Sequence, residues 1–305
     1  MNRILNFHEV YDYQWFDSLV GFLSSKYKMV SLDAINTSFY GDIHLKNACH
    51  ITVDDGEKSF VENIFPIMKK YNVPVTLFVS PKIITNNLNY WFQEIRGYNP
   101  IYLTKIISDI TGTSYELANN CDPVWILKTL TITEILEIIK KYQSANHTSS
   151  KKHQNICWKS LVKISQSELV TIGAHTMNHP ILKNESGAES NFEISESVNE
   201  LSNLLGYKIK YFAYPNGKRY LDFTNREEEI LKKNDVQLAV TTEPGNLASN
   251  NDKMRVPRIG IPDGQKLPIV KLKLMLGSHL NSIRKLKVSE EVKQRNRITR
   301  KFSTS

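Results

Sequence analysis

Two adjacent carboxylates at the end of an apolar run constrain this chain most. Residues 51–53 have the pattern of a buried strand, Asp54, Asp55 and Gly56 follow directly, and a helical period begins near Phe60. The acidic pair is therefore expected on the turn after the carboxyl end of a strand, where α/β barrels and open α/β sheets assemble their chemistry. Like charges this close are costly to desolvate unless a cation or a shared proton stabilises them. One interpretation is a metal or a catalytic proton, and the other is an acidic turn with Asp55 as a helix N-cap.

A pair of histidines favours the first interpretation. His175 and His179 lie four residues apart, after the apolar run 169–172. On a helical turn this spacing places two imidazoles on one face, within reach of one ion. Two nitrogens and one carboxylate are typical of a catalytic metal site, which keeps coordination positions open. His153 and Cys157 have the same spacing, but no carboxylate motif accompanies them, so we interpret them as structural or incidental.

Length and composition predict an ordinary globular protein. The 305 residues, 41% of them hydrophobic, suit one large or two small α/β domains with a sizeable core. Much of the net charge of +8 comes from residues 271–301. Three cysteines without a Cys-x-x-Cys pair favour a reducing compartment. Because we find neither a secretory h-region nor an apolar run of about 18 residues, we expect a cytoplasmic protein, or one held peripherally at the inner membrane face.

Strand and helix patterns alternate along most of the chain and predict a barrel-like α/β fold. Residues 1–287 are expected to form one domain, whose first strand ends at His8. Residues 82–165 are expected to be a helical insertion that covers one rim. The polar residues 288–305 are expected to be a disordered, basic tail. Before this tail we expect a basic amphipathic helix at 268–287, with an apolar side formed by Leu272, Met275, Leu276 and Leu280.

These motifs resemble the polysaccharide deacetylase family, also called the NodB-homology family or carbohydrate esterase family 4. Residues 52–56 are similar to its motif Thr-Phe-Asp-Asp-Gly, with valine at the aromatic position, and residues 175–180 are similar to its His-Ser/Thr-x-x-His-Pro. Residues 213–217, Ala-Tyr-Pro-Asn-Gly, resemble a strand that ends in Pro-Tyr-Gly. Residues 7–10 resemble the opening of a permuted branch that includes deacetylases of poly-N-acetylglucosamine, and residues 256–259 resemble the late arginine segment.

The resemblance implies a distorted (β/α) barrel that removes acetyl groups from N-acetylated sugars with a divalent metal, most often zinc. It makes Asp54 the general base, and it makes Asp55, His175 and His179 the metal ligands. A carboxylate beside the metal can take a proton from the attacking water, which agrees with the role of Asp54.

The resemblance also implies roles outside the two main motifs. Arg258 would orient Asp54, although it could be a solvated arginine, and the backbone N–H of Asn216 would help to form an oxyanion hole. His8 would be the general acid, although a lone histidine at a strand end is often a core residue. We expect His8 and Asp54 to flank the metal from opposite sides, because a poor amine leaving group needs its own proton donor. The expected substrate-binding residues are Tyr214, Pro215 and Trp91.

Alternative functions remain open. A haloacid-type phosphatase is excluded, because it needs Asp-x-Asp and the residue two positions after Asp54 is Gly56. A deformylase or an O-deacetylase of a lipid-linked or nucleotide-linked sugar would fit a cytoplasmic location, and a glycan-binding relative without turnover is a non-enzymatic alternative. The helix at 268–287 and the tail could touch a membrane surface weakly, or the helix could pack on the core with its lysines reaching solvent. We expect a carbohydrate substrate and no nucleic-acid partner, because neither aromatic residues nor a motif accompany the basic charge.

Overall fold

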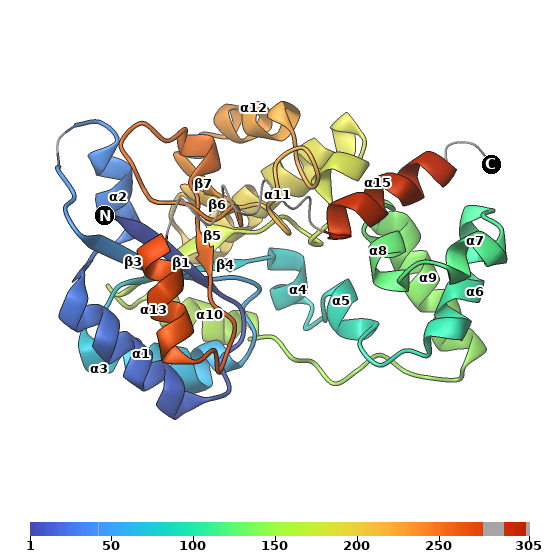
Figure 1. Cartoon of the computed structure of the whole chain (residues 1–305), viewed down its shortest axis with the longest axis horizontal. Coiled ribbons are helices and arrows are strands. Elements are labelled where there is room, and N and C mark those ends of the chain that lie inside the picture. The colour runs from blue at the N-terminus through green and yellow to red at the C-terminus, as the bar shows by residue number, and fades with distance from the viewer. Residues whose placement is uncertain (42, 277–289, 303–305) are drawn as a thin grey trace.

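In the described part of the chain, eight parallel strands form a curved sheet at the centre of the molecule (Figure 1). This computed structural model describes residues 1–41, 43–276 and 290–302. The strand order is β7-β6-β5-β4-β3-β1-β8, with β2 paired to β3. The strands are β1 (Arg3–Phe7), β2 (Lys28–Met29), β3 (Ala48–Val53), β4 (Val75–Val79), β5 (Val170–Ala174), β6 (Tyr211–Ala213), β7 (Leu238–Val240) and β8 (Ile259–Gly260).

The central strands are buried on both faces, as is typical of parallel sheets covered by helices. Every residue of β1, β3 and β4 is buried. Phe7 pairs with Val53, so the carboxyl ends of β1 and β3 lie level. The residues that follow β1 and β3, beginning with His8 and Asp54, therefore emerge next to each other at one edge of the sheet.

The two ends of the sheet approach each other without forming a continuous ladder. Val256, shortly before β8, makes a single parallel bridge to Val240 of β7. The backbone N–H of Arg258 donates to the carbonyl of Glu243 over 3.1 Å. These contacts bring the segment before β8 against the end of β7, at the opposite end of the strand order. The sheet is thus an incompletely closed, distorted (β/α) barrel, which confirms the predicted fold class.

Helices between the strands cover the sheet and bury its apolar side chains. In α1, for example, Phe16, Leu19 and Leu23 join the main core, and α1 contacts α3. None of the described helices is both long and apolar enough to cross a bilayer. These elements are α1 (Tyr13–Lys26), α2 (Leu32–Ser38), a π-helical turn (Phe60–Ile64), α3 (Phe65–Tyr71), α11 (Gly187–Leu205), α12 (Asn225–Lys233), α13 (Leu267–Leu276) and two 3-10 turns (Leu182–Asn184 and Lys253–Arg255).

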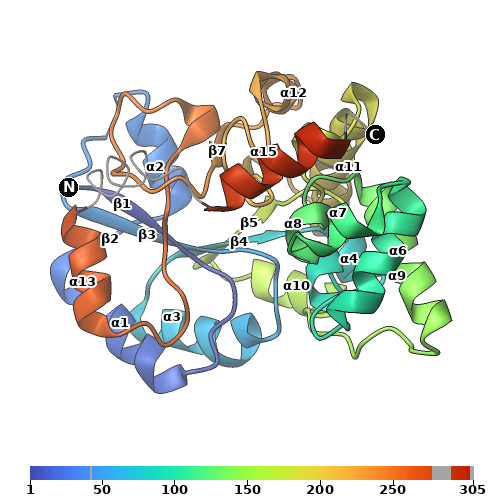
Figure 2. The same cartoon turned by 45° about the vertical axis from the view of Figure 1, so that its right-hand side comes forward.

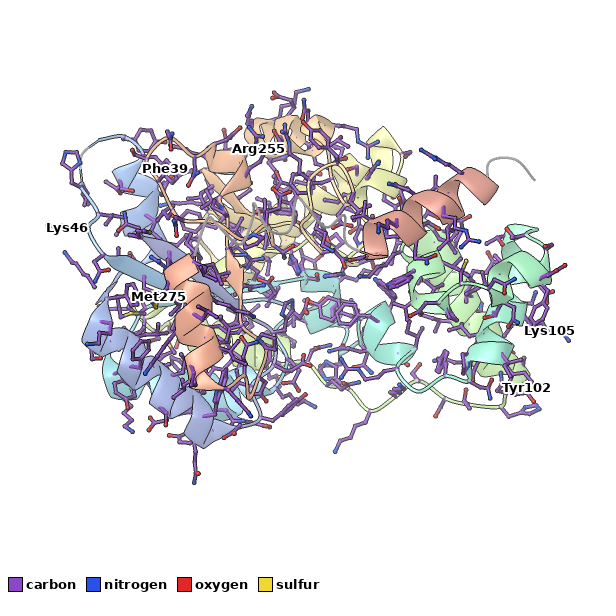
Figure 3. The ribbon with its side chains drawn as sticks, in the orientation of Figure 1. Phe39, Lys46, Tyr102, Lys105, Arg255 and Met275 are labelled. Carbon is purple, nitrogen blue, oxygen red and sulfur yellow. The ribbon has the colours of Figure 1, made fainter. Side chains whose placement is uncertain are left out.

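Between β4 and β5 the chain forms a helical insertion, which lies beside the sheet (Figure 2). Part of it has an apolar core of its own, to which α9 contributes Ile135 and Ile138. Tyr102 and Lys105 mark the outer end of this part (Figure 3). The helices are α4 (Pro81–Thr85), α5 (Trp91–Glu94), α6 (Pro100–Thr111), α7 (Tyr115–Asn119), α8 (Pro123–Leu127), α9 (Ile132–Ala145) and α10 (Trp158–Ser165).

The expected apolar side of the helix at 268–287 is wrong within α13. Leu272 and Met275 are 54% and 74% exposed, and Figure 3 shows Met275 on the surface of α13. Val270 and Leu274, which are one helical turn apart, are the buried residues. The sequence holds apolar residues all around this helix, so its periodicity did not identify the face that packs. Residues 277–287, including Leu280, lie outside the described part of the chain.

The C-terminal tail also differs from the prediction. Residues expected to be disordered form α15 (Glu290–Phe302), which contacts α8. Ile298 is buried in the apolar core of the insertion, and Arg295 makes a buried ion pair with Asp222. The composition of residues 288–305 predicted disorder because it could not show that the insertion supplies an apolar surface and the barrel supplies a carboxylate for this helix.

Candidate metal and catalytic site

Three buried side chains bring potential metal ligands together at the carboxyl edge of the sheet. They belong to Asp55, which follows β3, and to His175 and His179, which follow β5. One donor atom from each lies within 4.8 Å of the other two. The distance from Asp55 Oδ1 is 3.5 Å to His175 Nε2 and 3.7 Å to His179 Nε2. These are the three residues to which the sequence assigns the metal.

The chemistry of these donors fits a divalent cation. His175 Nδ1 lies 2.6 Å from the carbonyl oxygen of Ala213, which can only accept, so Nδ1 carries the proton. The lone pair of His175 therefore lies on Nε2, which faces Asp55. Metal-binding histidines commonly donate the N–H of their other ring nitrogen to a carbonyl in this way. Asp55 Oδ1 is buried, and it has no hydrogen-bond partner among the described residues. An orphaned carboxylate oxygen beside two imidazole nitrogens is a suitable site for a cation.

The electrostatics of the site favour the ligand forms of two of these residues. Burial and the charge of His175 lower the pKa of His179 to about 3, so its ring is neutral at pH 7. Burial alone would raise the pKa of Asp55, but the imidazoles of His175 and His179 hold it well below its usual range. For His175, burial is outweighed by Asp55 and Asp54, which raise its pKa. A cation would take the place of the proton that these carboxylates attract.

The histidine motif adopts a tight turn and not the regular helical turn that its spacing suggests. Thr176 and His179 have positive φ angles of 63° and 58°, and Thr176 Oγ1 accepts the His179 N–H over 3.0 Å. The carboxylate of Glu193, on α11, accepts the backbone N–H groups of Met177 and Asn178, each over 2.9 Å. It also accepts the Asn178 side-chain amide. Glu193 could not be identified from the sequence, because nothing in its local pattern links α11 to this turn.

Two aromatic residues before and in α5 support the site from the insertion. The Trp91 indole N–H donates to the His179 carbonyl over 3.1 Å, and the Tyr90 hydroxyl donates to the Asp55 carbonyl over 2.9 Å. Both side chains are buried. Trp91 also lines a 220 Å³ cavity together with Asn178. Its observed role is to hold the metal-binding turn, and substrate binding by Trp91 stays a prediction.

Asp54 is held by Arg258 in a two-point ion pair. The guanidinium Nη1 and Nη2 donate to Asp54 Oδ1 and Oδ2 over 2.7 and 2.8 Å, and both side chains are buried. Arg258 also donates to Asn6 Oδ1 and to the Thr52 hydroxyl. Burial would raise the pKa of Asp54, but Arg258 holds it below its ordinary value. Asp54 is therefore ionised at neutral pH, and each oxygen keeps a further lone pair that can accept a proton.

His8 lies next to Asp54, and their expected placement on opposite sides of the metal stays a prediction. The His8 Nε2 is 4.0 Å from Asp54 Oδ2. The pairing of Phe7 with Val53 explains this, since it leaves the residues that follow β1 and β3 adjacent. The His8 side chain is half exposed, and it lines a 560 Å³ cavity. The other lining residues are Asn6, Glu9, Lys218, Thr242, Pro244, residues 259–263 and Lys273.

The turn after β6 presents a backbone donor. Asn216 and Gly217 have positive φ angles of 56° and 70°. A Cβ on Gly217 would lie 2.8 Å from the backbone nitrogen of Thr242, which explains the glycine. Among the described residues, no hydrogen bond uses the backbone N–H of Asn216. This N–H is thus available to a ligand, as an oxyanion donor must be.

The residues before this turn do not suit the substrate-binding role predicted for them. Tyr214 is fully buried, stacks on Phe223 at 3.7 Å between ring centroids, and donates its hydroxyl to the Met254 carbonyl over 3.0 Å. Pro215 is also buried. Tyr214 and Pro215 therefore build the core beneath the turn, and the prediction that they contact substrate is wrong for this structure.

Comparisons with known proteins agree with the architecture. The family described as polysaccharide deacetylase matches residues 43–239. The Streptococcus pyogenes deacetylase PplD, in complex with acetate, superimposes with a TM-score of 0.60 at 17% identity, covering 89% of this chain and 97% of its own. IcaB from Ammonifex degensii gives a TM-score of 0.59 at 18% identity, with 89% and 95% covered. The BpsB deacetylase domain from Bordetella bronchiseptica gives 0.56 at 14% identity, with 86% and 96% covered. A search of curated protein sequences gave no match.

The matched segment and the site overlap. Asp54, Asp55, His175 and His179 lie within residues 43–239, whereas Arg258 lies outside them and reaches the site through the fold. The solved structures are too distant in sequence to show more than a shared fold, but the family match covers more than half of the chain. The chain belongs to the polysaccharide deacetylase family.

Proposed function

We propose that this protein is a metal-dependent hydrolase that removes acetyl groups from N-acetylated sugars of a polysaccharide or a glycan precursor. The convergence of Asp55, His175 and His179 beside the clamped Asp54 is the observation that carries the proposal. One carboxylate and two imidazoles are a donor set that zinc accepts in catalytic sites, so Zn²⁺ is the proposed ion. When bound, it would polarise the acetyl carbonyl and make a water molecule more acidic.

The other residues of the site supply proton transfer and charge stabilisation. Arg258 keeps Asp54 ionised and fixes its plane, so that Asp54 can accept the proton of the attacking water. We assign the donation of a proton to the leaving amine to His8, which faces the cavity. We assign the stabilisation of the developing oxyanion to the Asn216 N–H, since a fixed backbone donor needs no reorganisation during the reaction.

The cavity beside His8 supports a sugar as the substrate. Its volume of 560 Å³ lies within the range of about 300–1,000 Å³ typical of small-ligand sites. Its wall carries Glu9 and Asp263 as well as Lys218 and Lys273, so charges of both signs are present. A neutral ligand rich in hydroxyl groups can use such donors and acceptors together. A strongly charged ligand of either sign would be repelled by the wall residues that carry the same charge.

A weak membrane contact and a cytoplasmic location are further parts of the proposal. α13 exposes Ile269, Leu272 and Met275 together with Lys271, and such a surface suits anionic lipid headgroups. None of the three described cysteines forms a disulfide, in keeping with a reducing compartment. Sedimentation with vesicles of phosphatidylglycerol or phosphatidylcholine tests the contact. Binding to neither kind of vesicle would remove it from the proposal.

Acetate release tests the proposed reaction. We expect the zinc-loaded protein to release acetate from penta-N-acetylchitopentaose, to lose this activity after chelation and to regain it with Zn²⁺. A panel of O-acetylated and N-formylated sugars distinguishes the alternatives. Release only from these substrates would favour an O-deacetylase or a deformylase. Binding of the oligosaccharide without any release would favour a glycan-binding relative and contradict the proposal.

A further inference from the structure

Helix α15 extends from the insertion to the barrel loop that follows Asn216. In both views it lies beside α8, with its first turns toward the barrel (Figures 1 and 2). Ile298 belongs to the apolar core of the insertion. Arg295, almost one turn earlier on the same helix, is buried against the barrel loop at 218–222. This single helix therefore contacts both parts of the molecule.

The Arg295 guanidinium is bound by three oxygens. Its Nη1 donates to Asp222 Oδ1 over 2.6 Å, and both side chains are almost completely buried. Its Nη2 donates to the carbonyls of Leu221 and Lys128, over 3.1 and 3.0 Å. Lys128 belongs to the insertion, whereas Leu221 and Asp222 belong to the barrel. A planar guanidinium that satisfies three acceptors fixes their relative positions better than a rotating ammonium group would.

Asp222 transmits this restraint to the turn after β6. Its second oxygen, Oδ2, accepts the backbone N–H of Lys218 over 2.9 Å, and its own N–H donates to the Lys218 carbonyl over 2.8 Å. Lys218 directly follows Asn216 and Gly217, whose positive φ angles define the turn. The backbone that aims the Asn216 N–H is therefore held from α15 through one carboxylate.

A second contact of α15 acts on the cavity beside His8. Glu291 accepts hydrogen bonds from the ammonium groups of Lys218 and Lys128, the latter over 3.0 Å. Lys218 lines the same cavity as His8. Glu291 thus determines where the Lys218 ammonium group lies at the cavity wall, and α15 restrains both the backbone and the side chain of this residue.

We propose that Arg295 is a positioning residue for the deacetylation, acting through Asp222 on the turn that carries the Asn216 N–H. Helix α15 is then part of the catalytic unit, although it follows the family match by 50 residues of chain. The inference rests on the proposed function in one respect, the use of the Asn216 N–H by the oxyanion. The restraint on the turn itself does not depend on the reaction.

Arg295→Gln tests the inference, and Arg297→Gln is the matched control, because Arg297 is exposed on the same helix. In the zinc-loaded Arg295→Gln protein, amide hydrogen exchange should become several-fold faster in peptides that cover residues 214–222, with no change in Arg297→Gln. On penta-N-acetylchitopentaose, kcat should fall about 10- to 100-fold while KM changes little, since a displacement of about 1 Å can cost about 100-fold in rate. Arg295→Lys keeps the charge without the two-point geometry, so its kcat should be intermediate.

The outcomes separate the positioning role from a general effect on stability. A folded Arg295→Gln protein with wild-type exchange in the turn and wild-type kcat overturns the inference, as does an equal loss in Arg297→Gln. If Arg295→Gln does not fold, the double variant Asp222→Asn/Arg295→Gln serves the same test, because it leaves no unpaired buried charge. If the wild-type protein releases no acetate from this oligosaccharide, that result contradicts the proposed function and not the positioning role. Faster exchange in the turn would still support the positioning role, and unchanged exchange would overturn it.

Discussion

The imidazole Nε2 of His8 lies 4.0 Å from the carboxylate Oδ2 of Asp54, and each residue directly follows one of two neighbouring parallel strands. The proposed proton donor and the proposed proton acceptor are therefore side by side. The attacking water loses a proton and the leaving amine gains one, and this arrangement keeps the two proton transfers close together. Because the two residues are so close, the effects of substituting them must be distinguished by comparing substrates with different leaving groups.

Asp54→Asn should keep the metal and lose turnover. An amide cannot accept the proton of the water, and the loss of a general base costs about 10²–10⁴-fold in rate. Acetate release by the zinc-loaded protein and elemental analysis of the same sample check this together. The substitution also leaves the buried Arg258 without its full charge partner, so the thermal midpoint should fall. A variant with near wild-type kcat would remove Asp54 from the role of base.

His8→Ala should slow amide hydrolysis more than ester hydrolysis. An alkoxide leaves with less help than an amine, so an ester substrate depends less on the proposed acid. The measurement compares kcat/KM on matched N-acetyl and O-acetyl sugars, with the exposed His44→Ala as the control. Equal losses on both substrates would exclude the acid role. Loss of bound zinc would instead make His8 a metal ligand.

His179→Ala should abolish stoichiometric zinc binding. Only two of the three donors would remain, and two protein ligands are too few to hold zinc at micromolar free zinc. His153→Ala is the control, because His153 also has a histidine-ligand spacing, to Cys157, and lies outside the site. Elemental analysis and a thermal shift on addition of zinc report the outcome. Full zinc content in His179→Ala would show that the metal is held elsewhere.

Glu193→Gln should weaken zinc binding without removing a ligand. The neutral amide can accept fewer of the three hydrogen bonds by which Glu193 holds the turn between the histidines. Partners that orient metal ligands are worth about 10- to 100-fold in metal affinity. Competition with a calibrated chelator measures the change, and Glu196→Gln, on an exposed position of α11, is the control. Equal zinc affinity in both variants would show that Glu193 does not position the metal-binding turn.

Glu185 should make stability depend on pH near neutrality. Burial raises its pKa to about 7, against an ordinary value of 4.5, and its Oε1 accepts the Ile132 N–H over 2.7 Å. Because the folded state holds the proton more tightly, the stabilisation is complete below pH 4.5 and is lost as the pH rises through 7. Glu185→Gln should reduce the loss of stability between pH 5 and pH 8, as measured by urea unfolding. The same slope in Glu185→Gln as in the wild type would contradict this assignment.

The fold and the position of the acidic pair could be predicted from the sequence because they depend on local patterns. Apolar strands followed by helices predict a parallel sheet, and a carboxylate after such a strand must lie at its carboxyl edge. The ion pair of Arg258 with Asp54 was inferred from family resemblance, and the structure shows it. Neither periodicity nor composition could have linked two residues so distant in the chain.

The remaining features depend on which surfaces meet in three dimensions. The position of Tyr214 after a strand gives no sign of burial, but Phe223 stacks on its ring and the Met254 carbonyl accepts its hydroxyl. The charged segment that forms α15 has little apolar content, and its order depends on Ile298 and Arg295 finding partners in separate parts of the fold. Such partners cannot be recognised from a window of neighbouring residues.

The placement of β1 between β3 and β8 has a consequence for synthesis of the chain. All three proposed metal ligands have been translated once residue 179 is made, whereas Arg258 follows almost 80 residues later. A nascent chain can therefore contain the whole ligand set while Asp54 still lacks the guanidinium that orients it. Contacts between distant segments form slowly because they close long loops. We accordingly expect metal capture to precede catalytic competence during folding, with the pairing of β8 to β1 as the step that completes the enzyme.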